Sequence, residues 1–128
     1  MDVKTIMTSD ETGSGMVEYA HNLASKLVNE KLGRSQIRNI FSEVRQIELM
    51  WNSENQTDAV RRLTMLKPKL AYQTGRHKSV KGLKNVLEPA IDIVINTPEG
   101  EDRDKVFQRF VDFFEAILAY HRLEGGRD

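Results

Sequence analysis

The stretch SQIRNIFSEVRQIELMW, residues 35–51, decides the fold class. Its apolar side chains recur every three or four residues, at Ile37, Ile40, Phe41, Val44, Ile47 and Trp51. At about 100° per residue these positions share one face of a helix, and mostly polar residues occupy the other face. A half-buried strand would show apolar residues at every second position, which this stretch lacks. The pattern predicts an amphipathic helix, with Ser35 placed to cap its start.

Four further stretches repeat this period. They predict helices over residues 16–28, 57–75, 79–95 and 102–123. Gly33 follows the helix over 16–28 as a candidate left-handed C-terminal cap, and Pro68 either kinks the helix over 57–75 or restarts it. Pro89 lies on the polar side of its helix as a second candidate kink. Because no stretch shows sustained alternation, we expect an all-α, single-domain five-helix bundle with short loops.

The two ends of the chain differ from the middle. Residues 1–15 are rich in Thr, Ser and Gly and have little apolar surface, so we expect a flexible N-terminal leader there. Residues 16–123 form the predicted helical domain, and residues 124–128 a C-terminal tail. The total of 128 residues suits one domain with one core.

Composition excludes several classes of function. The absence of cysteine rules out disulfides, thiolate zinc sites and a thiol nucleophile. His21, His77 and His121 are far apart and form no local metal motif, and no phosphate-binding glycine loop is present. We therefore expect no metal, no cofactor and no catalytic residue. The N-terminus resembles neither a secretory signal nor a membrane span, which indicates a cytoplasmic protein that binds no membrane.

The charges are segregated along the chain although they sum to zero. Residues 1–60 hold six Lys or Arg against nine Asp or Glu, and residues 88–128 hold five against ten. Residues 61–87 hold eight Lys or Arg and no acid. A solvated helix face normally mixes both signs, so this segment favours binding to a polyanion.

Four basic residues of the segment are predicted to share one side of a helix. Arg61, Arg62, Lys69 and Arg76 lie within an arc of roughly 100°, opposite the leucines. Tyr72 and Met65 share this arc, and Lys78, Lys81 and Lys84 continue the charge beyond it. Cations that neutralise phosphates, next to a ring that can stack on a base, are typical of single-stranded RNA binding.

Three segments together resemble one known family. LKPKLAYQTGR (66–76), SQIRNIFSEV (35–44) and FVDFFEAILAYHR (110–122) resemble the small helical subunit of the type III-A CRISPR interference complex, in the order and spacing of that family. The resemblance covers about residues 16–123. It implies a non-catalytic scaffold that stacks in several copies along the effector complex, braces its backbone filament and contacts crRNA and single-stranded target RNA. The backbone and large subunits are the implied protein partners, and a homodimer in isolation is left open.

The candidate RNA-binding residues come from the resemblance and from charge. The resemblance places Lys69, Tyr72, Arg76 and Arg38 in family-like segments, and these are our first candidates for RNA contact. Charge geometry adds Arg62, Lys67, Lys78 and Lys81, with Arg34 the weakest of the set.

Two other functions compete with this hypothesis. The basic strip could steer a protein-interaction module towards an acidic partner, and salt-dependent binding to generic RNA would separate the two. His77 could also act as a general base in a helical endoribonuclease, although the sequence offers no second group beside it. The apolar arc of the helix over 102–123 is wide, which indicates either a central helix or one covered by another chain.

Overall fold

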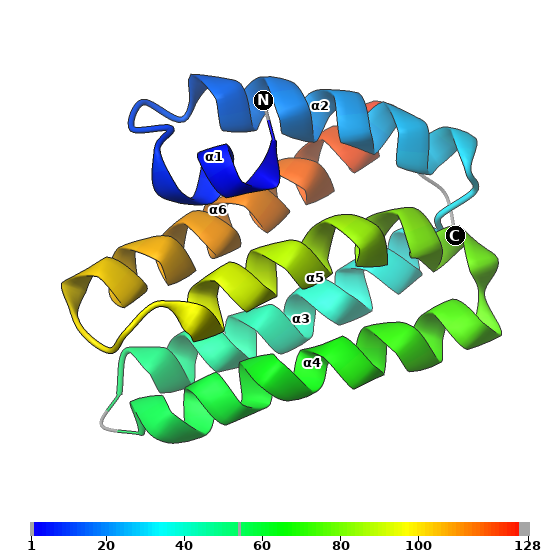
Figure 1. Ribbon diagram of the computed structural model, residues 1–128. Helices are drawn as coiled ribbons and strands as arrows, with labels where there is room; N and C mark the ends of the chain where they lie inside the picture. The colour runs from blue at the N-terminus through cyan, green and yellow to red at the C-terminus, as the bar shows by residue number, and fades with distance from the viewer. Residues whose placement is uncertain (1, 54, 126–128) are drawn as a thin grey trace.

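The computed structural model describes residues 2–53 and 55–125 (Figure 1). Within these ranges the chain forms six α-helices and no strand, so the all-α prediction is confirmed and the predicted number of helices is one too low. The helices are α1 (Val3–Thr8), α2 (Ser14–Asn29), α3 (Arg34–Trp51), α4 (Gln56–Arg76), α5 (Lys81–Asn96) and α6 (Glu101–Leu123). A short 3₁₀ helix, η1 (Lys78–Val80), joins α4 to α5.

Helix α6 lies at the centre of the bundle. It packs against α2 on one side and against α3 and α5 on the other, and α4 covers α3 and α5 at the far edge (Figure 1). Phe107, Phe110, Phe113 and Phe114 are all buried along α6. The wide apolar arc of this helix therefore faces the core of its own chain, as expected for a central helix.

The predicted flexible leader is wrong for residues 3–8, which form helix α1. Ile6 and Met7 are 0 % exposed and join the main core, where α1 contacts α5 and α6. Asp2 caps the helix by accepting a hydrogen bond from the Thr5 amide at 2.8 Å. This hydrogen bond also lowers the pKa of the Asp2 carboxyl. Two adjacent apolar residues anchor the segment, but six residues are too few for periodicity to reveal a helix.

The joint between α2 and α3 also differs from the prediction. Gly33 has extended backbone (φ −76°) and is the N-cap of α3, and its amide donates to Gln36 Oε1 at 2.8 Å. The left-handed residue after α2 is Lys31, with φ 71°. Helix α3 accordingly begins at Arg34, and Ser35 lies in its first turn instead of capping it.

Both internal prolines lie inside continuous helices. Pro68 falls in the middle of α4 and Pro89 in the middle of α5, and both side chains are exposed. Since α4 runs from Gln56 to Arg76 without a break, the restart at Pro68 that the sequence allowed does not occur. The residues on either side of Pro68 therefore keep their helical spacing, which fixes the arc on which the basic side chains lie.

The C-terminal end of α6 is tied to α2. Glu124 accepts a hydrogen bond from the His21 ring at 2.6 Å, and that ring stacks on Tyr120 with centroids 4.3 Å apart. Residues 126–128 of the predicted tail lie outside the described residues, and the boundaries at residues 15 and 123 stay predictions. In the part of the chain that the structure describes, every helix is too short or too polar to cross a lipid bilayer.

Candidate nucleic-acid interface

Helix α4 turns its leucines inwards and its basic residues outwards. Ala59, Leu63, Leu66 and Leu70 are buried against α3 and α5. Arg61, Lys69, Tyr72 and Arg76 are exposed, whereas Arg62 and Lys67 are half-buried. The arc predicted from the sequence therefore exists, and it borders the seam between α4 and α3.

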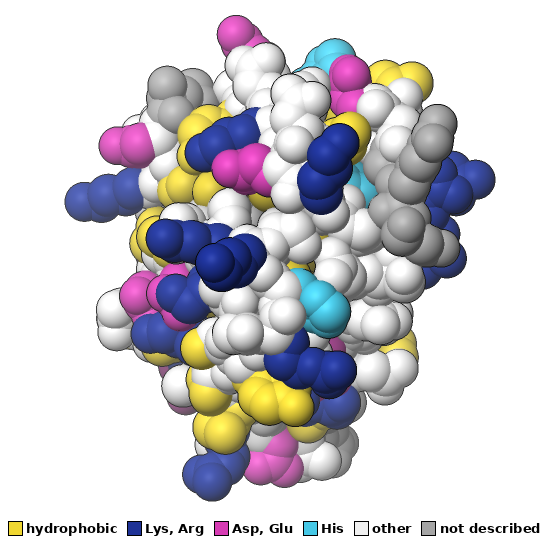
Figure 2. Space-filling view, turned by 90° about the vertical axis from the view of Figure 1, so that its right-hand side faces the viewer, with side chains coloured by type: hydrophobic (Ala, Val, Ile, Leu, Met, Phe, Trp, Pro, Cys, Tyr) yellow, Lys and Arg dark blue, Asp and Glu magenta, His cyan; other side chains and the backbone are white. Residues whose placement is uncertain are grey.

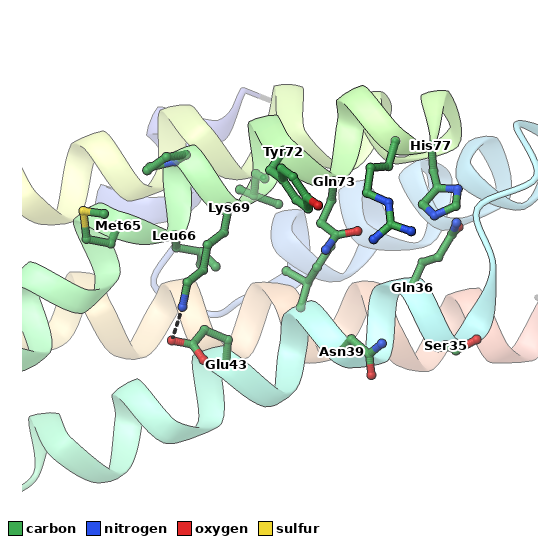
Figure 3. Close-up of a pocket in the computed structure, with 14 residues that line it drawn as sticks. Ser35, Gln36, Asn39, Glu43, Met65, Leu66, Lys69, Tyr72, Gln73 and His77 are labelled. Carbon is green, nitrogen blue, oxygen red and sulfur yellow. Dashed lines mark hydrogen bonds and ion pairs between the residues drawn. The ribbon is translucent and has the colours of Figure 1, made fainter.

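A groove of about 620 Å³ follows this seam (Figure 3). Lys69, Tyr72 and Arg76 of α4 line one wall, and Gln36, Asn39 and Glu43 of α3 line the other. In Figure 3, Tyr72, Gln73 and His77 extend from α4 over the side of the groove that carries Gln36 and Asn39. The structure thus brings three of the first four candidates together. Sequence reasoning missed the amides of Gln36, Asn39 and Gln73, because isolated amides give no pattern.

Two large side chains of the groove, Tyr72 and Met65, are open to solvent. Tyr72 is 62 % exposed and Met65 is 49 % exposed. The Arg76 guanidinium carbon lies 5.9 Å from the centroid of the Tyr72 ring, within the range of a cation–π contact. A base that stacked on the open face of Tyr72 would carry its phosphate near Arg76 and Lys69.

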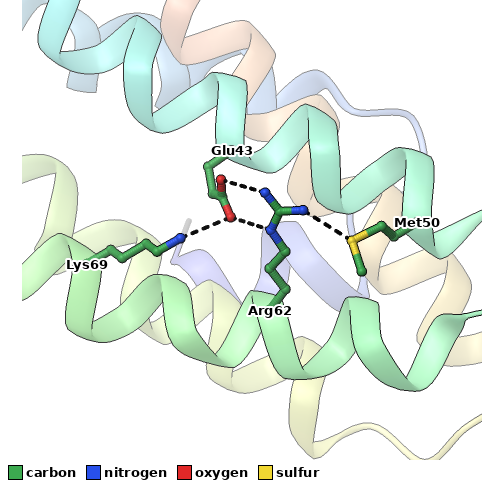
Figure 4. Close-up of polar contacts among 4 residues, drawn as sticks. All are labelled: Glu43, Met50, Arg62 and Lys69. Carbon is green, nitrogen blue, oxygen red and sulfur yellow. Dashed lines mark hydrogen bonds and ion pairs between the residues drawn. The ribbon is translucent and has the colours of Figure 1, made fainter.

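An acidic residue of α3 neutralises part of the basic strip. Glu43 binds Arg62 through both carboxylate oxygens, at 2.7 and 3.1 Å, and binds Lys69 at 3.2 Å (Figure 4). The hydrogen bonds from Arg62, and then those from Lys69, lower the pKa of the Glu43 carboxyl. The same pair raises the pKa of the Arg62 guanidinium. Arg62 also points towards the sulfur of Met50, 3.3 Å away, so it is held in a structural role.

Two further cations of the segment are paired with α5 acids. Lys67 Nζ lies 2.6 Å from Asp92 Oδ1, and this bond raises the pKa of the Lys67 ammonium. Lys84 lies 3.4 Å from Glu88 on the same helix. The basic residues of this segment therefore do not form an uninterrupted positive surface. Glu43 and Asp92 lie outside residues 61–87 in the sequence, but they contact cations of this segment because α3 and α5 pack against α4.

The other cations near this groove have no carboxylate partner among the described residues. No described carboxylate forms an ion pair with Arg61, Arg76, Lys78 or Lys81. Lys78 and Lys81 lie where α5 begins, beside Lys26 and Glu30 of α2. Figure 2 shows this end of the bundle, where Lys and Arg side chains are spread over uncharged surface with acidic side chains among them. The positive charge is thus distributed and does not form one continuous strip.

Arg34 and Arg38 lie on the opposite flank of α3. They line a second pocket, of about 240 Å³, between α3 and α6, together with Arg122 and His121. The structure therefore divides the predicted RNA-binding residues between two surfaces on either side of α3. Arg122 was not among the candidates, since a lone arginine near a helix C-terminus is ordinarily read as a helix-end charge.

The three histidines are separated in the structure as well as in the sequence. His21 pairs with Glu124, His121 is buried, and His77 is exposed at the end of the α3/α4 groove. Among the described residues, no group of three His, Asp or Glu side chains could hold a metal ion. Glu43 is the one carboxylate among the described residues that line the groove with His77, and it is already bound by Arg62 and Lys69.

Comparison with known proteins identifies the family. The sequence matches the family described as Csm2 Type III-A over residues 10–127. The chain belongs to the Csm2 type III-A family. The resemblance to the small helical subunit of the type III-A CRISPR complex, read from residues 35–44, 66–76 and 110–122, is thereby confirmed.

Two relatives illustrate the extent of the match. The chain is 29 % identical to the CRISPR system Cms protein Csm2 of Streptococcus thermophilus over 122 residues, 91 % of this chain and 97 % of the relative. It is 28 % identical to the protein of the same name from Enterococcus italicus over 95 residues, 70 % of this chain and 65 % of the relative. No solved structure matches the chain. The match therefore extends through the segments that build both surfaces beside α3.

Proposed function

We propose that this protein is a non-catalytic, RNA-binding small subunit of a type III-A CRISPR effector complex. In this role several copies stack along the complex, brace its backbone filament and contact crRNA and the single-stranded target RNA. The backbone and large subunits are the expected protein partners. Family membership supports the place in the complex, and the α3/α4 groove supports the contact with RNA.

The observation that carries the RNA contact is the juxtaposition of Tyr72, Arg76 and Lys69 in this groove. Tyr72 offers an open ring, Arg76 carries an unpaired guanidinium beside that ring, and Lys69 shares Glu43 with Arg62. Stacking on a ring tolerates any base, and phosphate contacts carry no sequence information. The groove is therefore suited to a strand whose sequence is read by base pairing elsewhere.

A comparison of Tyr72→Ala with Tyr72→Phe tests the stacking role. Stacking of a base on an aromatic ring contributes ~1–3 kcal/mol, so Tyr72→Ala should weaken binding of a short single-stranded RNA by about fivefold to a hundredfold. Tyr72→Phe keeps the ring and should bind nearly as well as the wild type. Fluorescence anisotropy at low and physiological salt measures both. Equal affinities for the Ala and Phe variants would remove Tyr72 from the interface.

Neutralisation of the cations tests the phosphate contacts. The double variant Lys69→Gln/Arg76→Gln should bind RNA roughly tenfold more weakly and show a shallower dependence of affinity on salt, by about 1.4 in the log–log slope. The matched control is Lys4→Gln/Lys105→Gln, which removes the same charge from exposed positions on α1 and α6. If both variants lose affinity equally, only the net charge matters and the groove has no special role.

The non-catalytic role has its own test. His77 lies in the groove without a second base or acid placed to assist it, so RNA incubated with the purified protein should stay intact. Cleavage that disappears in a His77→Ala variant would overturn this part of the proposal. Co-purification with tagged backbone and large subunits, followed by sequencing of the bound RNA, tests the place in the complex.

A further inference from the structure

Three arginines that line the pocket between α3 and α6 have no carboxylate partner among the described residues. Arg34 and Arg38 extend from the first turns of α3, and Arg122 extends from the last turn of α6. Glu115 is the one carboxylate among the described lining residues, and Arg45 already binds it at 2.5 Å from outside the pocket. No described carboxylate pairs with the three lining arginines.

The floor of the pocket is apolar, and two of its lining residues each have a buried polar atom without a hydrogen-bond partner among the described residues. Leu118 and Ala119 supply the apolar surface. His121 is 0 % exposed, and its Nε2 donates to the Leu32 carbonyl oxygen at 2.8 Å. Neither His121 Nδ1 nor Arg34 Nε has a hydrogen-bond partner among the described residues. Buried polar atoms are rarely left unsatisfied, so the pair marks a place built around polar chemistry.

We propose that this α3/α6 pocket binds one nucleotide of single-stranded RNA. The guanidinium groups of Arg38 and Arg122 hold the phosphate at the rim, Arg34 closes the inner wall, and the base or sugar covers Leu118 and Ala119. The pocket volume of about 240 Å³ accommodates a group of this size. A lone carboxylate from a protein partner would satisfy the arginines but leave the apolar floor uncovered. This inference rests on the proposed RNA-binding function and adds a second subsite to it.

The position of the pocket on α3 would allow one RNA strand to bind both the α3/α4 groove and the α3/α6 pocket. Around the helix axis, Arg34 and Arg38 lie about 40° apart, and Asn39 of the α3/α4 groove lies roughly 100° beyond Arg38. Ser42 occupies the arc between them and is exposed. A strand that crosses α3 over Ser42 would pass from the α3/α4 groove to the α3/α6 pocket across one helix width, about 10 Å.

The binding test uses His121 as a reporter. Uridine monophosphate is added to the full chain while the ring signals of His21, His77 and His121 are followed by NMR. We expect the His121 signals to shift because a nucleotide over the pocket changes the surroundings of the buried ring. The shift should disappear in Arg38→Gln/Arg122→Gln and in Ala119→Phe, which fills the pocket without removing charge. Because both substituted side chains in the first variant are exposed, its fold should be preserved, which circular dichroism checks.

Binding of short single-stranded RNA to the same variants separates this inference from the general function. We expect both pocket variants to bind about fivefold to tenfold more weakly, whereas Lys105→Gln binds as the wild type does. If only the Lys69→Gln/Arg76→Gln variant loses RNA affinity and His121 does not shift, the pocket inference is wrong and the RNA-binding function stands. If uridine monophosphate shifts His121 but RNA does not bind, the pocket takes free nucleotides only, and both the inference and the proposed RNA-binding function are wrong. A shift caused by an oligoglutamate peptide but not by the nucleotide would assign the pocket to an acidic protein partner and overturn the inference.

Discussion

Arg62 of α4 donates from Nε and Nη2 to the two carboxylate oxygens of Glu43 on α3, at 2.7 and 3.1 Å. This two-point contact joins the two helices that form the candidate RNA groove. It also places a negative charge on the groove wall, next to Lys69. Glu43 therefore stabilises the contact between α3 and α4. Under the proposed function it also competes with RNA phosphates for Lys69 and Arg62, so its loss should lower stability and raise RNA affinity.

The first prediction concerns the loss of this charge. Glu43→Gln should increase the affinity for single-stranded RNA by about twofold to fivefold at low salt, because Lys69 and Arg62 become available to phosphates. The free energy of unfolding should fall by at most about 1 kcal/mol, since the pair is partly solvated. Anisotropy and urea unfolding measure the two effects. Glu18→Gln removes an equal charge from an exposed position on α2 and should change neither quantity. An equal gain in affinity for both variants would show that only net charge matters.

The second prediction concerns pH. Hydrogen bonds from Arg62 and Lys69 hold the pKa of Glu43 below its ordinary value of 4.5 in the folded protein. The contribution of this ionised group to stability is therefore complete above about pH 4.5 and is lost as the pH falls through the folded pKa. The difference in unfolding free energy between the wild type and Glu43→Gln should be largest near pH 7 and shrink towards pH 3. Urea unfolding across this range measures it. A difference that grows as the solution is acidified would contradict the assignment.

The long helices could be predicted from sequence, whereas the ion pairs could not. Helical spacing alone places Lys69, Tyr72 and Arg76 on one arc, and the uninterrupted path of α4 through Pro68 preserves that arc. Glu43 and Asp92 lie outside the acid-free segment in sequence, and only the packing of α3 and α5 on α4 brings them to it. Segregation of charge along a chain does not ensure segregation on a folded surface.

Short elements and the positions of single residues could not be predicted from the sequence either. Helix α1 has six residues, too few to show a period, and it depends on tertiary contacts of Ile6 and Met7. Arg122 joins Arg34 and Arg38 only because α6 ends beside the start of α3. Neither feature leaves a pattern in sequence, since both arise from where distant segments meet.

The third prediction concerns Trp51, which links the end of α3 to the start of α6. Its Nε1 donates to Asp104 Oδ1 at 2.9 Å, and its ring stacks on Phe107 with centroids 4.0 Å apart. Asp104→Ala leaves a buried indole N–H without this acceptor and should lower the free energy of unfolding by about 1–3 kcal/mol. Trp51→Phe keeps an aromatic ring and leaves Asp104, which is exposed to water, with its hydrogen bond from Gln56 Nε2 at 3.1 Å, so it should cost only about 1 kcal/mol.

The control for this prediction is Asp102→Ala. Asp102 lies in the same first turn of α6 and is exposed, and no hydrogen bond to another described residue involves its side chain. It shares the favourable interaction of an acid with the helix N-terminus, so its loss should lower the free energy of unfolding by about 0.3–1 kcal/mol. Urea unfolding of both variants measures the difference. Equal losses for Asp102→Ala and Asp104→Ala would mean that the hydrogen bond to Trp51 contributes nothing beyond the charge.

The fourth prediction concerns helix α1, which a flexible leader would not form. Ile6→Ala removes a fully buried side chain from the core and should lower the free energy of unfolding by about 2–4 kcal/mol, provided that α1 unfolds together with the rest of the chain. If α1 detaches first, the loss is limited to the free energy with which it docks on α5 and α6. Lys4→Ala is the matched control, because Lys4 is exposed on the same helix and should change stability by less than about 0.5 kcal/mol.

Hydrogen exchange distinguishes these two forms of unfolding. The contact of Arg109 Nη1 with the Met7 carbonyl oxygen, at 3.3 Å, joins α1 to the central helix, so amides of α1 should be protected in the wild type. In Ile6→Ala they should exchange faster than amides of α6 if α1 detaches alone, and in step with them if the chain unfolds as one unit. Equal stability of Ile6→Ala and Lys4→Ala, with unprotected α1 amides in the wild type, would restore the flexible leader. In that case the apolar surface of α5 and α6 beneath α1 would be open to solvent.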